Sequence, residues 1–344
     1  MTLGFTSGPA LGGATPRLAP TPGDVVYREG GVQVYRFRRP AAALDTGLPL
    51  LLVPSMINRW YVLDLRPGAS VVEALTRAGI DTFCLDWGVP HDEDRYLTWD
   101  DVLARLRRVA RRVARLAGAP RLGVLGYCMG GTLAGIHAAL HPEETAALVN
   151  LAGPFDFGAA GFMARVSEER FFDAAAVGAA GNVSAHQLQA GFTLLRPTLS
   201  LAKLVGLVDT AGKPEARAAS AALETWANDG VPFPAAAYVT YIRDLYQQNR
   251  LVAGTHRVAG QAVDLRAIRC PVLTIVAERD VICPPAAATA LNRCCGSRDT
   301  TVLAVPGGHV GAVVGRRAVR ELYPALGAWL RARLGYPPSA PPRA

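Results

Sequence analysis

The sequence predicts an α/β fold in which a mostly parallel sheet is covered by helices on both faces. Short apolar segments of strand length alternate along the chain with longer segments of helical periodicity, and this alternation is typical of parallel sheets. The chain has 344 residues, of which 50% are hydrophobic, so it can bury a large core. Its size suits one elaborated domain rather than two independent domains.

The expected elements follow in chain order. A hairpin is predicted over Val25–Arg38, with its turn at Gly30-Gly31. Helices are expected between most of the later strands. Residues 1–24 and 337–344 are expected to be tails, and residues 25–155 and 265–336 are expected to form the core. The later strands are predicted at Leu50–Val53, Thr82–Leu85, Leu122–Leu125, Ala147–Leu151, Val272–Val276 and Thr301–Val305.

Residues 156–264 interrupt this alternation. The segment has a helical pattern, is rich in alanine and leucine, and separates the two halves of the predicted core. An insertion at this place is expected to form a helical cap over an active site. We expect its aromatic residues to pack in the interior more often than they contact substrate. They are Trp226, Phe233, Tyr238, Tyr241 and Tyr246.

The string Gly126-Tyr127-Cys128-Met129-Gly130-Gly131 lies between the strand Leu122–Leu125 and a predicted helix, Thr132–Leu140. Strand, sharp turn and helix in this order form a nucleophile elbow, here with cysteine where serine is common. The glycines leave room beside a strained central residue, and a helix N-terminus stabilises a thiolate. We therefore predict an α/β-hydrolase fold with Cys128 as the nucleophile.

Such a fold places an acid and then a histidine after the nucleophile. Asp280 follows the predicted strand Pro271–Ala277, and His309 follows the last predicted strand. Both would then lie with Cys128 at the carboxyl edge of the sheet, although Glu278 and Asp299 are rival acids. The remaining histidines are less favourably placed: His137 and His141 belong to the elbow helix and its end, and the others are His91, His186 and His256.

Two backbone amides are expected to form an oxyanion hole. One would come from Met129, which directly follows the nucleophile. The other would come from the loop after Leu50–Val53. Pro54 has no amide hydrogen, so Met56 is favoured, with Ser55 as the rival.

The formal net charge of +8 raises the question of nucleic-acid binding. Many arginines lie in the predicted helix Asp101–Leu116, whose apolar residues form one stripe at helical spacing. Arg107, Arg108, Arg111 and Arg115 then fall on the opposite, solvated side. No nucleic-acid motif accompanies the charge, so we expect a solvated helix face and no nucleic-acid partner. A modest attraction of the charge to the phosphates of coenzyme A, or to an anionic granule surface, stays open.

The remaining composition favours a cytoplasmic enzyme. No apolar stretch reaches the roughly 20 residues that span a bilayer, and the N-terminus lacks the pattern of a signal peptide. The six cysteines have neither metal nor disulfide spacing, which indicates reduced thiols and no metal site.

Several segments together resemble one family, the short class III or class IV polyhydroxyalkanoate synthases. The resemblance covers about Val25 to Leu334. Its most specific strings are Asp86-Trp87-Gly88 and Tyr246-Gln247-Gln248-Asn249. It is also carried by Leu51–Leu65, Asp81–Pro90, the elbow, Tyr241–Leu251 and Pro306–Gly311. Met129 stands where class III catalytic subunits usually carry glutamine.

The resemblance implies an acyltransferase that polymerises (R)-3-hydroxyacyl-coenzyme A into a polyester and releases coenzyme A. Cys128 would carry the acyl group, His309 would be its base, and Asp280 would be the third member of the catalytic triad. The coenzyme A thioester is a substrate, and no cofactor is implied. A homodimer, an accessory synthase subunit and the surface of polyester granules are the implied partners.

Two other functions are compatible with these residues. A cysteine hydrolase or acyl-coenzyme A thioesterase would use the same triad, with water as the acyl acceptor. A non-catalytic granule or scaffold protein could retain the fold, but the intact set of Cys128, Asp280 and His309 argues against it.

Overall fold

The computed structural model describes residues 16–40, 47–194 and 214–337. An eight-stranded sheet runs in the order β1-β2-β6-β3-β7-β8-β11-β12. Its strands are β1 (Gly23–Glu29), β2 (Val32–Phe37), β3 (Leu50–Val53), β6 (Thr82–Asp86), β7 (Leu122–Tyr127), β8 (Thr145–Leu151), β11 (Val272–Ala277) and β12 (Thr300–Val305). Two small ribbons pair β4 (Asp64–Arg66) with β5 (Ala69–Ser70), and β9 (Arg257–Val258) with β10 (Gln261–Ala262).

The predicted α/β-hydrolase fold and its mostly parallel sheet are confirmed. β1 and β2 form the expected hairpin, and β2 is antiparallel to β6. The other pairs of neighbours in this sheet, along the order β6-β3-β7-β8-β11-β12, are parallel. β7 continues to Tyr127, beyond the predicted end at Leu125, because Gly126 and Tyr127 still pair with β8.

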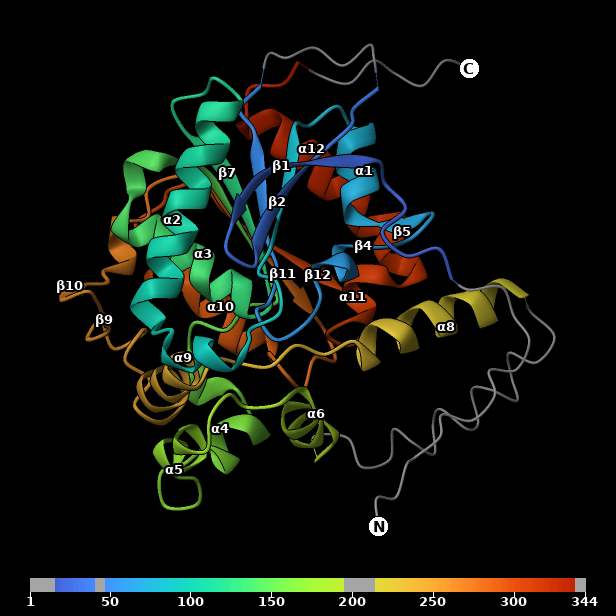
Figure 1. Cartoon of the computed structure of the whole chain (residues 1–344). Helices are drawn as coiled ribbons and strands as arrows, with labels where there is room; N and C mark the ends of the chain where they lie inside the picture. Colours follow the sequence, from blue (N-terminus) through green and yellow to red (C-terminus); the bar gives the residue numbers. More distant parts are fainter. Residues whose placement is uncertain (1–15, 41–46, 195–213, 338–344) are drawn as a thin grey trace.

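The two faces of the sheet bury separate apolar layers because successive strand residues point to opposite sides. In β3, Leu51 and Val53 pack in the layer that contains α2 (Trp99–Leu116), α3 (Met129–Leu140) and α10 (Pro285–Cys294). Leu50 and Leu52 pack in the opposite layer with α1 (Val71–Arg77) and α12 (Tyr323–Arg333). Figure 1 shows α2 and α3 on one side of the strands and α1 and α12 on the other.

The helices match the predicted periodicity, with one correction. α3 begins at Met129, three residues before the predicted start at Thr132, because the glycines of the elbow form its closely packed first turn. α2 is capped by Thr98, whose side chain accepts a hydrogen bond from the Asp101 amide. Arg108, Arg111 and Arg115 are exposed and Arg107 is half-buried, as expected for the solvated side.

Residues 156–264 contain α4 (Phe162–Val166), α5 (Ala174–Ala179), α6 (Ala185–Leu194), α8 (Pro214–Asn228), α9 (Ala235–Thr240) and a π-helical turn, Tyr241–Gln247. In Figure 1, α4, α5, α6 and α9 lie together below the sheet and its flanking helices. All five aromatic residues of this segment are buried, as packing residues would be; that they pack rather than contact substrate stays a prediction.

Parts of the predicted tails (1–15 and 338–344) and of the predicted cap (195–213) lie outside the described residues. The division into core, cap and tails stays a prediction. Within the described ranges, no helix has both the length and the hydropathy needed to cross a bilayer.

Candidate active site

Cys128 lies at the turn between β7 and α3, as the sequence predicts for a nucleophile elbow. Its backbone has φ +56° and ψ −128°, a conformation that a non-glycine residue adopts only at a cost of about 1–3 kcal/mol. The Cys128 amide donates to Leu151 O at 2.9 Å, and Cys128 O accepts from the Gly131 amide at 2.8 Å. These bonds hold the half-buried thiol at the N-cap of α3, where the helix dipole favours negative charge.

Close backbone approach explains two of the elbow glycines. A Cβ atom at Gly126 would lie 2.1 Å from Gly130 O, and one at Gly130 would lie 2.0 Å from Val53 O. Neither position therefore accepts a side chain without a shift of the backbone. The contact at Gly130 also brings the start of α3 directly against the end of β3.

Asp280 and His309 come together at the ends of β11 and β12. Asp280 Oδ2 lies 2.6 Å from His309 Nδ1, and both residues are buried. Asp280 Oδ1 accepts from the amides of Ile282 and Cys283, each at 2.9 Å. The carboxylate is thus fixed by its own loop, and it fixes the imidazole in turn.

The two rival acids do not contact His309 in this way. Asp299 forms a bidentate pair with Arg333, at 3.0 Å to each oxygen. Glu278 is exposed beside a surface cavity of about 590 Å³ whose other lining residues include Arg279, Arg316 and Arg317. The geometry therefore selects Asp280 as the partner of His309.

The second ring nitrogen of His309, Nε2, is the one that does not contact Asp280, and the ring lies near Cys128. Nε2 is buried and forms no well-aligned hydrogen bond within the described parts of the chain. Burial alone would lower the pKa of His309, but the nearby Cys128 thiolate and Asp280 carboxylate outweigh this effect and raise it. The thiolate acts mainly through its charge, since the geometry of a direct hydrogen bond is poor. The site therefore makes His309 a stronger base than an ordinary imidazole.

The expected oxyanion residues lie on the two segments that meet at the elbow. Met129 is the first residue of α3, and the first amides of a helix have no acceptor within it. The loop with Ser55 and Met56 follows β3, whose last carbonyl approaches Gly130. Both side chains in the loop are buried. The structure brings these segments together, while the assignment of the second amide to Met56 stays a prediction.

Sequence reasoning gave no role to Trp87, which stabilises the oxyanion loop. Its Nε1 donates to Pro54 O at 3.0 Å, and the neighbouring Asp86 accepts from the Gly88 amide at 3.0 Å. The signal was present in the Asp86-Trp87-Gly88 string, which the sequence marked as family-specific without a function.

Two tyrosines of segment 156–264 also lie close to the nucleophile. The rings of Tyr241 and Tyr246 are 5.6 Å apart, and Phe157 stacks edgewise on both. Burial, and for Tyr246 next the negative charge of the Cys128 thiolate, raises the pKa of these phenols. Both are therefore neutral, buried groups near the thiol. The sequence predicted packing for them but not this proximity.

The string Tyr246-Gln247-Gln248-Asn249 also holds the segment together. Asn249 accepts from the Phe157 amide and donates to Asp156 Oδ1, both at 2.9 Å. Gln247 Nε2 donates to Phe172 O at 2.9 Å. These bonds join the end of the π-helical turn to the first part of segment 156–264.

Two known families match parts of the chain. Residues 49–315 match a family described as alpha/beta hydrolase fold, and residues 13–75 match one described as the N-terminus of poly-beta-hydroxybutyrate polymerase (PhaC). The poly(3-hydroxyalkanoate) polymerase subunit PhaC of Allochromatium vinosum is 34% identical over 316 residues, 91% of this chain and 89% of that protein. The protein of the same name from Thiocystis violacea is 32% identical over 91% of this chain and 89% of its own length.

Solved structures resemble the chain in fold alone. A soluble variant of monoglyceride lipase from Saccharomyces cerevisiae has a TM-score of 0.57 and 14% identity, with 91% of this chain and 97% of that chain covered. The non-heme bromoperoxidase BpoC of Mycobacterium tuberculosis has a TM-score of 0.53 and 18% identity, with 83% and 93% covered.

Proposed function

The chain belongs to the poly(3-hydroxyalkanoate) polymerase family, and we propose that it polymerises (R)-3-hydroxyacyl-coenzyme A through an acyl thioester on Cys128. The observation that carries the cysteine chemistry is the state of His309. Asp280 holds its Nδ1 at 2.6 Å, and its Nε2 is buried beside Cys128 without another hydrogen-bond partner among the described residues. That nitrogen is placed to accept the thiol proton.

In the first step His309 takes the proton from the Cys128 thiol, and the thiolate attacks the acyl carbonyl carbon of the coenzyme A thioester. The amides of Met129 and Met56 stabilise the oxyanion. The intermediate then breaks its bond to the coenzyme A sulfur, which leaves with a proton from His309. One thioester is exchanged for another, so the step is close to thermoneutral.

In the second step the 3-hydroxyl of another hydroxyacyl unit attacks the acyl carbon of the Cys128 thioester and gives its proton to the His309–Asp280 pair. The bond from this carbon to the Cys128 sulfur breaks, an ester forms, and the sulfur takes the proton to restore the thiol. Water is the competing acceptor, so exclusion of water decides between a polymerase and a thioesterase. Tyr241, Tyr246 and Phe157 are buried together, and both tyrosines feel the charge of Cys128. This aromatic cover supports polymerisation over hydrolysis.

Product analysis tests the proposal. Purified protein is incubated with (R)-3-hydroxybutyryl-coenzyme A, and released coenzyme A, insoluble polyester and free 3-hydroxybutyrate are measured. We expect polyester to account for most of the released coenzyme A. Stoichiometric free hydroxy acid would instead identify a thioesterase, and the absence of an acyl-enzyme on Cys128 would reject the covalent mechanism.

We further propose that the catalytic chain acts as a dimer in the cytoplasm, at the surface of polyester granules, together with an accessory subunit. The relatives are themselves called polymerase subunits. The cover formed by residues 156–264 must open for substrate entry and polymer exit, and a partner can shift that equilibrium.

The isolated chain should then show weak activity after a long lag, and the accessory subunit should raise the rate and shorten the lag. Sedimentation of the same sample measures the oligomeric state. Full activity without a lag, in protein shown to be free of any partner, would exclude this dependence while leaving the polymerase chemistry intact.

A further inference from the structure

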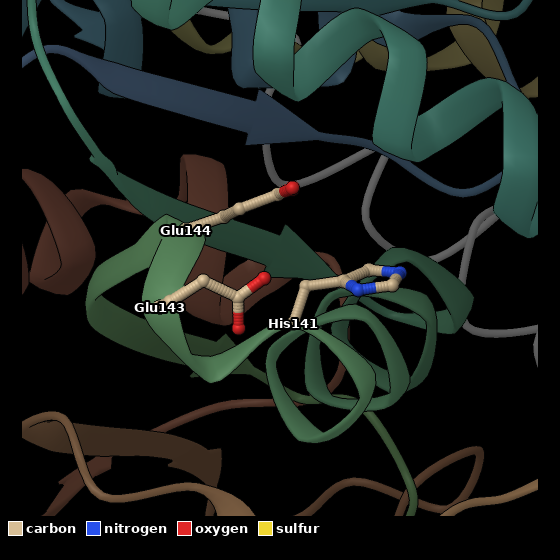
Figure 2. Close-up of side chains that lie close together, drawn as sticks. All are labelled: His141, Glu143 and Glu144. Atoms are coloured by element: carbon tan, nitrogen blue, oxygen red, sulfur yellow. The ribbon is translucent and has the colours of Figure 1, made fainter.

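At the opposite end of the elbow helix from Cys128, a second cluster of ionisable side chains surrounds the turn into β8. His141 is the C-cap of α3, and the 3₁₀ turn Pro142–Glu144 follows it. His141, Glu143 and Glu144 each offer one donor atom, and these atoms lie within 4.8 Å of one another. Figure 2 shows all three side chains leaving this turn. A helix of 12 residues separates the cluster from Cys128 by about 18 Å.

A buried imidazole distinguishes this cluster from an ordinary acidic turn. The side chain of His137 is 1% exposed, and neither of its ring nitrogens forms a hydrogen bond with any described residue. Its Nε2 faces Glu144 Oε2 at 4.0 Å, and that oxygen is also buried without a hydrogen bond there. Buried polar atoms normally have a partner. The nitrogen of His137 and the oxygen of Glu144 therefore form a pair of facing atoms that could both bind one ion.

The separation of these atoms suits a bridging cation. Zinc binds imidazole nitrogen and carboxylate oxygen at about 2.0–2.2 Å in a tetrahedral arrangement, which places two donor atoms roughly 3.4 Å apart. A small shift of the side chains would therefore bring His137 Nε2 and Glu144 Oε2, now 4.0 Å apart, to this separation. Small rotations of the half-buried His141 and the exposed Glu143 would complete the set. His137 and His141 are four residues apart on α3, which places them on one face.

A neighbouring arginine fixes the orientation of one carboxylate of the set. Arg107 donates to Glu144 Oε1 through Nε at 3.2 Å and Nη2 at 3.0 Å, which orients the carboxylate and leaves Oε2 free. The C-terminal end of α3 adds negative potential.

We propose that His137, His141, Glu143 and Glu144 bind a divalent cation of the zinc class. Two imidazoles with two carboxylates suit Zn²⁺ or Co²⁺, whereas Mg²⁺ and Ca²⁺ prefer oxygen ligands alone. The ion would join the end of the elbow helix to the turn before β8 and, through Arg107, to α2. The cysteine pattern led to the expectation of no metal site; this proposal rests instead on the pair His137 and His141 and the two glutamates.

The test measures binding of Zn²⁺ by calorimetry and of Co²⁺ by absorption to the chelator-treated full chain. We expect one ion per chain and a higher melting temperature with Zn²⁺. The Co²⁺ spectrum should lack the charge-transfer band of a thiolate ligand, which separates this site from the cysteines. The double variant His141→Ala/Glu143→Gln should lose at least the roughly 10–100-fold in affinity that removal of an outer-shell partner costs.

The matched control is His186→Ala/Glu169→Gln, which removes an exposed histidine and an exposed glutamate elsewhere and should bind like the unmodified chain. His137→Phe keeps the buried volume and should also weaken binding. Release of coenzyme A should be unchanged in the site variants, because the site is separate from Cys128. Equal affinity in the double variant and the control, a thiolate band, or no binding would each overturn the proposal.

Discussion

The two sides of the active site are built in different ways. On the sheet side, Cys128, Asp280 and His309 stand at the ends of parallel strands whose backbone pairing fixes their separation. On the other side, the proposed cover is drawn from the described residues of 156–264 and depends on a few side-chain hydrogen bonds. We therefore expect the sheet side to hold the reacting groups rigidly and the proposed cover to be able to move.

The difference is also visible in the distribution of apolar surface. In the described part of segment 156–264, Phe162, Val166 and Phe171 are 50%, 38% and 66% exposed, whereas the residues of β7, β8 and β11 are buried throughout. Exposed apolar groups of this kind often mark interaction surfaces. We expect changes on the sheet side to stop chemistry, and changes in the cover to alter stability and the fate of the acyl group.

The largest effect is expected from Cys128→Ala. Loss of the thiol should reduce coenzyme A release by several orders of magnitude, as for other enzymes that lose their nucleophile. The fold should be retained, because only one small group leaves a half-buried site. Stopped-flow coenzyme A assays and circular dichroism measure the two properties.

Cys128→Ser is the matched variant of the same shape. Its hydroxyl is harder to deprotonate and its ester is a poorer acyl donor, so activity should also be severely impaired. Near-normal activity in the alanine variant would discard the covalent mechanism and assign the chemistry to another part of the site.

A smaller and more selective effect is expected from Asp280→Asn. If Asp280 chiefly helps to deprotonate the incoming 3-hydroxyl, the variant should still form the first acyl-enzyme at an appreciable rate but make little polymer. Single-turnover acylation and polymer yield separate these steps. Equal loss of both would favour a role in orienting His309.

The same variant has a pH signature. The Asp280 carboxylate helps to raise the pKa of His309, so its removal should lower that pKa. The imidazolium that protonates the departing coenzyme A would then be lost at a lower pH. The alkaline decline of the rate should therefore shift to lower pH in Asp280→Asn. His309→Ala serves as the control, since its rate should not show this alkaline decline at all.

The sequence predicts the sheet side better than the cover. Strand pattern, glycine spacing and chain order located Cys128, Asp280 and His309, because each follows a strand whose apolar residues reveal it. The cover depends on tertiary contacts between distant residues, such as Asn249 with Asp156, and these leave no periodic signal. The orientation of the Met56 amide depends on the conformation of the loop after β3, which likewise leaves no periodic signal in the sequence.

Asn249→Ala should weaken the cover specifically. The change removes two hydrogen bonds and places alanine at φ +46°. We expect this to destabilise the local structure of the cover by about 2–4 kcal/mol, measured as faster hydrogen exchange within residues 156–264 while the sheet stays protected.

Asn249→Gly is the matched control, because glycine tolerates the positive φ and lacks the same hydrogen bonds. If Asn249→Gly loses less local stability than Asn249→Ala but more than none, the loss in Asn249→Ala comes partly from backbone strain and partly from the missing side-chain hydrogen bonds. Unchanged exchange in both variants would show that packing alone holds the cover.

The smallest effect is expected from Arg170→Ala, in the same segment. Arg170 Nε lies 2.7 Å from Glu168 Oε2, but their side chains are 70% and 41% exposed. Arg170 also lies over the exposed ring of Phe171, 4.5 Å from its centroid. Solvent screening and side-chain entropy limit such a pair to about 0–1 kcal/mol. Chemical denaturation and hydrogen exchange should therefore differ little from those of the unmodified chain. A loss as large as that in Asn249→Ala would mean that surface charge, and not the buried hydrogen bonds of Asn249, holds the cover in place.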